Sequence, residues 1–156
     1  SEKIVEQCFA EHKPLSFEIL DIDYFKQYND RYGHQAGDDC VRAIAALIRQ
    51  MESDQIFCAR YGGDEFVIIY SGMSAEEVCE RAEKLRQDVM ALQIEQRYTE
   101  GAFGVTISQG ICHDIPSNGN KNWDFLHVAD QALYRVKRRG RNRLCMTDIH
   151  GREIEV

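Results

Sequence analysis

The strongest constraint on the fold is a short acidic segment that joins two apolar runs. Residues 56–59 and 66–70 each have the length and the β-branched or aromatic composition of a strand. Between them the chain reads Arg-Tyr-Gly-Gly-Asp-Glu, and Gly-Gly is a favoured two-residue connection in a β-hairpin. The sequence therefore predicts a hairpin with Asp64 and Glu65 at its tip, although turns also collect Gly and Asp for backbone reasons alone.

Length and composition favour a soluble single domain. The 156 residues, 44% of them hydrophobic and 29% charged, suffice to bury a core without disulfides or metal ions. The six cysteines are dispersed and form no Cys-x-x-Cys pair, which argues against a zinc site or a disulfide framework and favours reduced thiols. A net charge of −7 gives no sign of a nucleic-acid-binding surface. No apolar stretch reaches membrane-spanning length, so we expect a cytoplasmic domain without membrane contact of its own.

Apolar periodicity and turn signals predict the remaining elements, in the overall order α-β-α-β-β-α-β-α-β. Helices are expected over 1–11, 36–52, 74–94 and 123–139, and further strands over 15–22, 104–111 and 144–147. Asp38 and Asp39 are expected in the first turn of the second helix, where carboxylates suit the helix dipole. Such a mixture of a hairpin and helical crossovers predicts an α/β (α+β) sandwich, with helices packed on a mostly antiparallel sheet.

Carboxylates also gather at the end of the first predicted strand. Because side chains alternate along a strand, Asp21 and Asp23 share one face and Ile22 points to the other. If the acidic hairpin lies beside this strand, Asp21, Asp23 and Asp64 converge, with Glu65 near them. Carboxylates about 5 Å apart repel by roughly 3 kcal/mol per pair at an effective dielectric of 20, so such a cluster requires a cation. Oxygen ligands favour Mg²⁺, whereas the alternative is that these acids only end a strand.

The segment that follows this strand carries groups suited to a nucleotide. Backbone amides around 24–26 can receive phosphate oxygens, and the Lys26 side chain adds a positive charge. Asn29 and Asp38 offer a carbonyl, an amide donor and a carboxylate, a set that matches the hydrogen-bonding edge of guanine. The alternative makes Asn29 a turn residue and Asp38 a helix N-terminal acid. His34 is either a loop hydrogen-bonding residue or a ligand contact.

A basic run near the C-terminus contrasts with the acidic chain. Residues 137–143 contain five cationic side chains, which is typical of a solvated helix end stabilised by the dipole. Together with an acidic metal cluster, the same run also suits a nucleoside triphosphate, because cations neutralise the phosphate oxygens that the metal does not reach. Lys137 and Arg141 are four residues apart and can reach one phosphate group together.

These motifs together resemble the GGDEF family of diguanylate cyclases over almost the whole chain. Four patterns match in family order and spacing: Asp-Ile-Asp-x-Phe-Lys-x-x-Asn-Asp, Gly-His-x-x-Gly-Asp, Arg-Tyr-Gly-Gly-Asp-Glu-Phe and Ala-Asp-x-Ala-x-Tyr-x-x-Lys-x-x-Gly-Arg-Asn. The resemblance implies a fold similar to the palm of nucleotidyl cyclases and polymerases. It also implies an enzyme that condenses two GTP molecules into cyclic di-GMP and releases two pyrophosphates.

The resemblance further implies a role for each matched position. Asp21, the Ile22 carbonyl and Asp64 correspond to the ligands of Mg²⁺, with Mn²⁺ as an alternative ion. Asp64 also matches the base for the ribose 3′-hydroxyl. Glu65 matches a required catalytic residue, whose role is either second-metal or water-mediated support. The substrate positions are Asn29, His34 and Asp38 for guanine and ribose, Tyr24, Phe25 and Lys26 for the phosphate cradle, and Lys137 and Arg141 for the triphosphate.

The chemistry that the resemblance implies requires two sites. Forming two phosphodiester bonds between two nucleotides needs two sites that face each other, so a two-fold homodimer is expected. The principal alternative is a catalytically silent GGDEF module that binds GTP or a cyclic dinucleotide as a signalling receptor. A third possibility is the same chemistry with a mixed product such as cyclic GMP-AMP, but Asp38 at the guanine-reading position favours GTP.

Two departures from the family pattern bear on regulation. An Arg-x-x-Asp product-inhibition site should precede Gly62 with five residues between the two, but 53–56 reads Ser-Asp-Gln-Ile, which predicts no product inhibition through that site. The signature Asp-x-Leu-Thr-x-Leu-x-Asn-Arg, expected before the first helix, is missing. We therefore expect 1–156 to be one GGDEF domain excised from the C-terminal part of a larger bacterial signalling protein. An upstream sensory domain would complete that protein, and a membrane tether is compatible with it.

Overall fold

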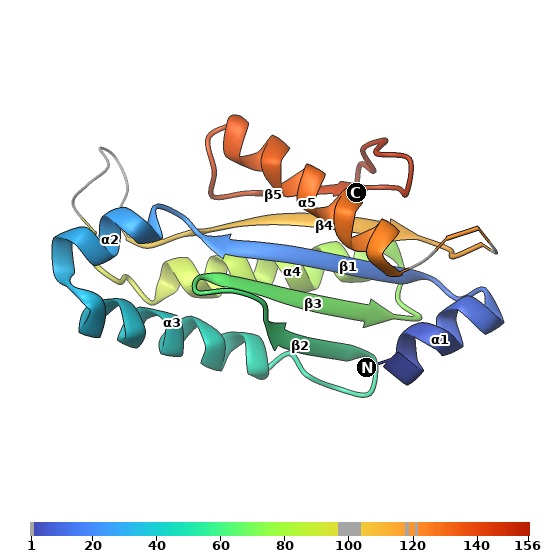
Figure 1. Cartoon of the computed structure of the whole chain (residues 1–156), viewed down its shortest axis with the longest axis horizontal. Coiled ribbons are helices and arrows are strands. Elements are labelled where there is room, and N and C mark those ends of the chain that lie inside the picture. The colour runs from blue at the N-terminus through green and yellow to red at the C-terminus, as the bar shows by residue number, and fades with distance from the viewer. Residues whose placement is uncertain (1, 97–103, 118, 121) are drawn as a thin grey trace.

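The computed structural model describes residues 2–96, 104–117, 119–120 and 122–156, and Figure 1 shows how its elements are arranged. The described strands form a five-stranded sheet in the order β2-β3-β1-β4-β5. In chain order, the elements are α1 (Glu2–Glu11), β1 (Leu15–Ile22), α2 (Phe25–Tyr32), α3 (His34–Arg49), β2 (Ile56–Arg60), β3 (Glu65–Ser71), α4 (Ala75–Ala91), β4 (Ile107–Asp114), α5 (Asn122–Arg138) and β5 (Leu144–Thr147).

The sheet is mostly antiparallel. Strand β1 lies at its centre and pairs in antiparallel orientation with β3 on one side and β4 on the other. Strand β2 extends the sheet as the antiparallel partner of β3, whereas β4 and β5 are parallel and are connected through the crossover helix α5. The predicted α+β sandwich with a mostly antiparallel sheet is therefore confirmed.

Helices cover both faces of the sheet, so the central strand is buried on both sides. All eight residues of β1 are buried. Leu20 and Ile22 belong to the core cluster that includes α3 and α4, whereas Phe17 and Ile19 belong to the cluster that includes α1 and α5. Because β1 is held from both layers, Asp21 near its end occupies a fixed position at the edge of the core.

Helix α2 was not predicted from the sequence, which suggested only a turn or phosphate loop there. Its aromatic residues Phe25, Tyr28 and Tyr32 have helical spacing, and Tyr28 is buried between the other two rings, with centroid distances of 6.3 and 4.8 Å. Asn29 is therefore helical and does not lie in a turn. Gly33, with φ of 91°, separates α2 from α3.

The other predicted elements are present with shifted ends. Helix α3 begins at His34, two residues earlier than predicted, so the predicted placement of Asp38 and Asp39 in its first turn is wrong. Strand β4 begins at Ile107 and ends at Asp114, three residues later than predicted at each end. Within the described residues, the helices lack the combination of length and apolar composition that a bilayer-crossing helix needs.

Candidate functional site

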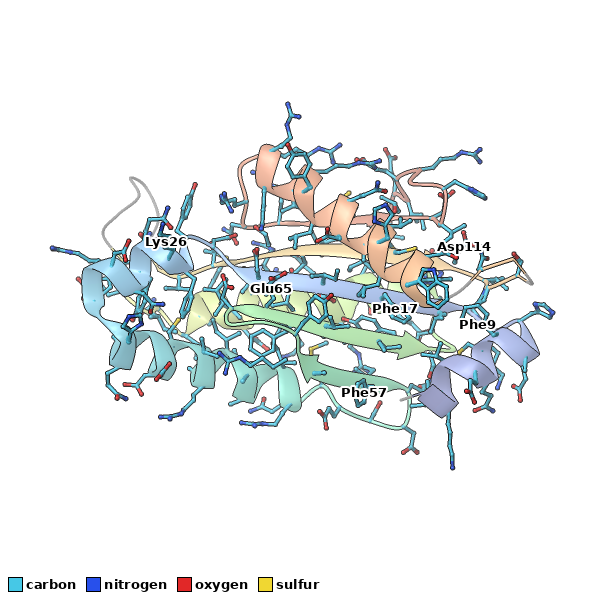
Figure 2. All side chains as sticks on the ribbon, in the orientation of Figure 1. Phe9, Phe17, Lys26, Phe57, Glu65 and Asp114 are labelled. Atoms are coloured by element: carbon cyan, nitrogen blue, oxygen red, sulfur yellow. The ribbon has the colours of Figure 1, made fainter. Side chains whose placement is uncertain are left out.

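The predicted site residues meet at one end of the two central strands. In the register of β1 and β3, Asp21 lies directly opposite Glu65. Just beyond this pair, the Ile22 amide donates a hydrogen bond of 3.1 Å to the Asp64 carbonyl. The acidic hairpin therefore lies beside the end of β1, which is the arrangement under which Asp21 and Asp64 were predicted to converge. Figure 2 shows Glu65 on β3 and Lys26 on α2 at this same end of the sheet.

The connection at the hairpin tip differs from the predicted two-residue turn. Strand β2 ends at Arg60 and β3 begins at Glu65, so four residues connect them. Two-residue hairpin turns need a positive φ, which neither Gly62 nor Gly63 adopts. Instead the Arg60 guanidinium donates to the carbonyls of Gly62 and Gly63, at 3.1 and 2.5 Å. Arg60, which was assigned no role from the sequence, therefore ties the tip to β2 and limits how Asp64 can move.

Asp21 is the most distinctive group in the site. Its side chain is buried, and its Oδ2 forms an ion pair with the Lys137 ammonium group. Its Oδ1 is also buried and has no hydrogen-bond partner among the described residues. Burial raises the pKa of Asp21 to about 6, although the hydrogen bond from Lys137 opposes this shift. The nearby charges of Asp23 and Asp64 also raise the pKa of Asp21, which places the three carboxylates in one electrostatic environment.

Asp23 takes part in a structural network and is not directed to the predicted metal cluster. Its carboxylate accepts hydrogen bonds from the Thr106 and Ser108 hydroxyls, at 2.7 and 2.5 Å, and from the Asn142 amide at 3.1 Å. These bonds tie the end of β1 to β4 and to the turn after α5. The sequence does contain a signal for these partners of Asp23, because Thr106 and Ser108 are two residues apart and so share one face of an extended segment. The prediction did not use it.

The oxygen atoms predicted to hold a metal ion are of the kind that Mg²⁺ takes in proteins. In the described part of the chain, no three acidic, His or Cys side chains form a preassembled metal site. The ligand set predicted by resemblance has two carboxylates, Asp21 and Asp64, together with the Ile22 carbonyl. Mg²⁺ is commonly held by one or two carboxylates while substrate phosphates and water complete its shell. The unpartnered Oδ1 of Asp21 is an oxygen available for such a contact.

Helices α2 and α3 bring together the residues predicted to contact the base. The Asn29 Oδ1 atom is buried without a hydrogen-bond partner among the described residues. A Cβ atom at Gly37 would stand 1.8 Å from this Oδ1. The Asn29 side chain can therefore occupy this position only because Gly37 has no side chain. Asp38 follows Gly37 directly in α3 and is exposed. His34 is exposed at the first position of α3.

The predicted phosphate-binding residues lie around the start of α2 and the end of α5. Tyr24 precedes α2 with a left-handed backbone, at φ of 56°. The Arg141 guanidinium lies over the Tyr24 ring, 4.6 Å from its centroid. Lys26 is exposed in the first turn of α2, Phe25 beside it is half-buried, and Lys137 reaches Asp21 from the last turn of α5. The structure thus brings cations from two separate elements to the acidic end of β1.

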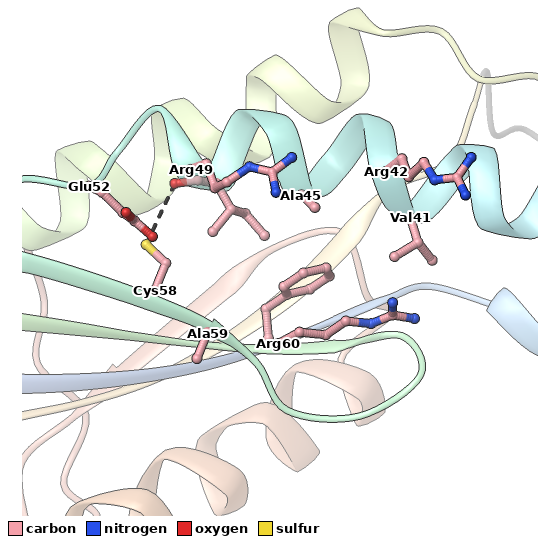
Figure 3. A pocket seen from close by; sticks show the side chains of 10 residues that line it. Val41, Arg42, Ala45, Arg49, Glu52, Cys58, Ala59 and Arg60 are labelled. Atoms are coloured by element: carbon pink, nitrogen blue, oxygen red, sulfur yellow. Dashed lines mark hydrogen bonds between the residues drawn. The ribbon is translucent and has the colours of Figure 1, made fainter. Parts of the chain in front are cut away.

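A separate groove runs beside the hairpin, between α3 and β2 (Figure 3). Its volume is about 330 Å³, and Val41 and Phe66 are among its apolar lining residues. Arg42, Arg49 and Arg60 add guanidinium groups to its lining. None of the predicted site residues lines this groove, so it does not coincide with the predicted chemistry.

The fold and the site define a domain of the nucleotidyl-cyclase type. Its mostly antiparallel sheet ends in paired carboxylates at β1 and β3, with cations from α5 beside them. The family model described as "Diguanylate cyclase, GGDEF domain" matches residues 2–143. The chain belongs to this family.

Curated relatives agree with the family model. A diguanylate cyclase of Vibrio cholerae is 36% identical over 140 residues, which cover 86% of this chain and 40% of that protein. Diguanylate cyclase DosC of Escherichia coli is 35% identical over 133 residues, which cover 84% of this chain and 28% of that protein. The chain thus spans less than half the length of these two relatives.

Solved structures show the same fold. The GGDEF domain of DgcB from Caulobacter crescentus, solved in complex with c-di-GMP, has a TM-score of 0.81 and 34% identity, covering 94% of this chain and 82% of that chain. The active GGEEF domain of a diguanylate cyclase from Vibrio cholerae has a TM-score of 0.77 and 33% identity, covering 92% of this chain and 89% of that chain.

Proposed function

We propose that this domain is a diguanylate cyclase that condenses two GTP molecules into cyclic di-GMP with release of two pyrophosphates. The observation that carries the proposal is the buried Asp21 carboxylate, which has one unpartnered oxygen, a lysine on the other, and Asp64 beside it. A buried carboxylate oxygen without a hydrogen bond lowers stability, and contact with a ligand is one use that retains such an oxygen. The family membership supports the same activity.

The base of GTP is bound by α2 and α3 in this proposal. The Asp38 carboxylate accepts hydrogen bonds from the N1-H and N2-H₂ groups of guanine, and the Asn29 amide supplies the complementary contact. The buried, unpartnered Oδ1 of Asn29 supports this role. His34, at the start of α3, contacts the ribose. Adenine lacks the two adjacent donors that Asp38 requires, so ATP is a poor substrate.

The triphosphate is bound at the end of β1. Backbone amides of Tyr24, Phe25 and Lys26 contact its oxygens, because amides at the start of a helix carry a partial positive charge. The side chains of Lys137 and Arg141 neutralise the remaining charge. When held by Asp21, Asp64 and the Ile22 carbonyl, Mg²⁺ or Mn²⁺ would offset phosphate charge and lower the pKa of the attacking hydroxyl.

The reaction proceeds by in-line displacement at phosphorus. Asp64 accepts the proton of a ribose 3′-hydroxyl, and this oxygen forms a bond to the α-phosphorus of the second GTP. The bond from that phosphorus to the bridging oxygen breaks, and pyrophosphate leaves with the bonding electrons. Glu65, opposite Asp21 in the sheet, contributes through a second metal ion or through a water-mediated contact. Since each site binds one GTP, two domains must face each other in a two-fold homodimer for both bonds to form.

The deciding experiment joins the domain to a dimerising upstream helix and incubates it with Mg²⁺ and GTP, or with GTP and ATP. Identification of the products by mass spectrometry should give cyclic di-GMP in both mixtures, and Asp64→Ala should abolish it while leaving the fold intact. GTP binding without any cyclic product would support the silent receptor instead. A mixed GMP-AMP product would overturn the assignment of Asp38 as a guanine-specific contact.

We also propose that the product does not inhibit the enzyme through an Arg-x-x-Asp site. The corresponding window, 53–56, begins with Ser53 and ends with Ile56, whose side chain is buried and apolar. Initial rates measured with added cyclic di-GMP should therefore stay constant through the micromolar range. A fall in rate at micromolar product would contradict this expectation.

A further inference from the structure

Arg86 links helix α4 to the turn that carries Arg141. Its side chain is only 17% exposed, and Glu83 on the same helix holds its Nε and one terminal nitrogen. The other terminal nitrogen donates to the Asn142 side-chain oxygen at 2.9 Å and to the Asn142 backbone carbonyl at 3.3 Å. A guanidinium group suits this geometry because its donors form a rigid planar fork.

Asn142 is also held from the opposite side. Its backbone amide donates to the Asp23 carboxylate at 3.1 Å and to the Ser108 hydroxyl at 3.3 Å. The amide, the carbonyl and the side chain of Asn142 are therefore all fixed, by Asp23 just after β1, by Ser108 of β4 and by Arg86 of α4.

These restraints oppose the strain in the turn. Arg141 and Asn142 both have left-handed backbones, at φ of 65° and 49°. This conformation costs a non-glycine residue roughly 1–2 kcal/mol, less for Asn, and persists where surrounding contacts enforce it. The Arg141 amide also donates to the Val136 carbonyl at 3.0 Å, which closes the end of α5. With this backbone, the Arg141 side chain lies over the Tyr24 ring at the end of β1.

We propose that Arg86 is a positioning residue for the triphosphate end of the substrate. It acts through Asn142, whose enforced backbone aims Arg141 at the phosphate site beside Tyr24. Arg86 itself contacts neither Tyr24 nor Arg141 through any hydrogen bond described for this chain. The inference rests on the proposed function, since it assigns Arg86 to the same GTP site.

The test compares nucleotides that differ only in phosphate. In isothermal titration of the whole domain, Arg86→Ala should weaken GTP binding about tenfold while guanosine binding stays within about twofold. Arg86→Lys, which keeps the charge but loses the fork, should fall between Arg86→Ala and the unaltered protein. Lys84→Ala is the matched control, because Lys84 is an exposed residue of α4 whose ion pair, among the described residues, is with Asp88 on its own helix. It should leave the affinities for both GTP and guanosine unchanged.

A second measurement separates this inference from the proposed function. In the ligand-free domain, amide hydrogen exchange at Asn142 should be faster in Arg86→Ala than in Lys84→Ala. Unchanged exchange, or an equal loss of affinity for GTP and guanosine, would overturn the positioning role and leave the cyclase proposal standing. An unaltered domain that binds GTP no more tightly than guanosine would overturn both.

Discussion

Three buried carboxyl groups on or next to β1 serve different purposes. Glu18 accepts hydrogen bonds from the Tyr70 hydroxyl and the Gln109 amide, and Asp23 accepts three bonds from β4 and the turn after α5. Asp21 instead keeps one oxygen without a partner among the described residues. Buried carboxylate oxygens without hydrogen bonds lower stability. Glu18 and Asp23 therefore have structural roles, whereas Asp21 keeps an oxygen that can contact a ligand.

Glu18 should make stability depend on pH. Burial raises its pKa to about 7 from an ordinary value of 4.5, against the opposing hydrogen bonds from Tyr70 and Gln109. Between these two values the folded state binds the proton more tightly than the unfolded state does. Stability should therefore fall as pH rises from 4.5 to 7, by roughly 3 kcal/mol, and change little from this source above 7.

Urea denaturation of Glu18→Gln across pH 5–8 measures this contribution. The variant should lose most of the decrease in unfolding free energy that the unaltered domain shows over this range. Glu80→Gln, which changes an exposed carboxyl on α4, should keep the decrease. If both variants follow the same pH dependence as the unaltered domain, Glu18 is not the group responsible.

Gly37 should control recognition of the base. Replacing Gly37 with Ala puts a methyl group where the Asn29 side-chain oxygen lies, at 1.8 Å, so Asn29 must leave its position. We expect Gly37→Ala to weaken GTP binding about tenfold and to leave pyrophosphate binding almost unchanged. Calorimetric titration measures both affinities. The control Ala46→Ser alters an exposed position of α3, and a comparable loss in that variant would show that Gly37 has no specific role.

At the scale of elements, the sequence predicted those helices and strands that are determined by the local pattern of apolar residues. The hairpin strands, the central strand and helix α5 follow from apolar periodicity and were found with small shifts. Helix α2 was missed because the segment after β1 was considered only for groups that bind a nucleotide, whereas its Tyr28 packs between two rings at helical spacing. The wider hairpin connection was missed because it depends on the Arg60 side chain, and the role of Asp23 because its partners lie 83 to 119 residues away.

Close packing of α5 on β4 should be the most fragile contact between elements. A Cβ atom at Gly110 would stand 2.2 Å from the Leu133 amide nitrogen and 2.4 Å from the Ala129 carbonyl oxygen. Backbone atoms cannot move aside as a flexible side chain can, so Gly110→Ala must push α5 away from the sheet. We expect a loss of about 2–3 kcal/mol in unfolding free energy, measured by urea denaturation. An unchanged midpoint and slope would show that α5 adjusts without strain.

At the scale of the whole molecule, the site is assembled from both helical layers. Helices α2 and α3 supply the residues proposed for the base, and α5 with its following turn supplies cations for the phosphates. Both sets lie near the end of β1, where we propose that a single nucleotide contacts them. In the proposed mechanism each domain binds one of the two GTP molecules that the reaction consumes. Two domains must therefore assemble before cyclic di-GMP can form.

A mixing experiment can test this requirement directly. If two sites must face each other, adding an equal amount of Asp64→Ala to a fixed amount of the unaltered domain redistributes the dimers. If all domains are dimeric and pair at random, the mixture contains twice as many dimers, and a quarter of them have two intact sites. The number of fully active dimers is then half the original number, so the rate of cyclic di-GMP formation should fall to about half. Equal addition of Lys84→Ala should instead double the rate, because every pair stays active. A rate that Asp64→Ala leaves unchanged would mean that single domains complete the reaction, and the two-fold arrangement would have to be abandoned.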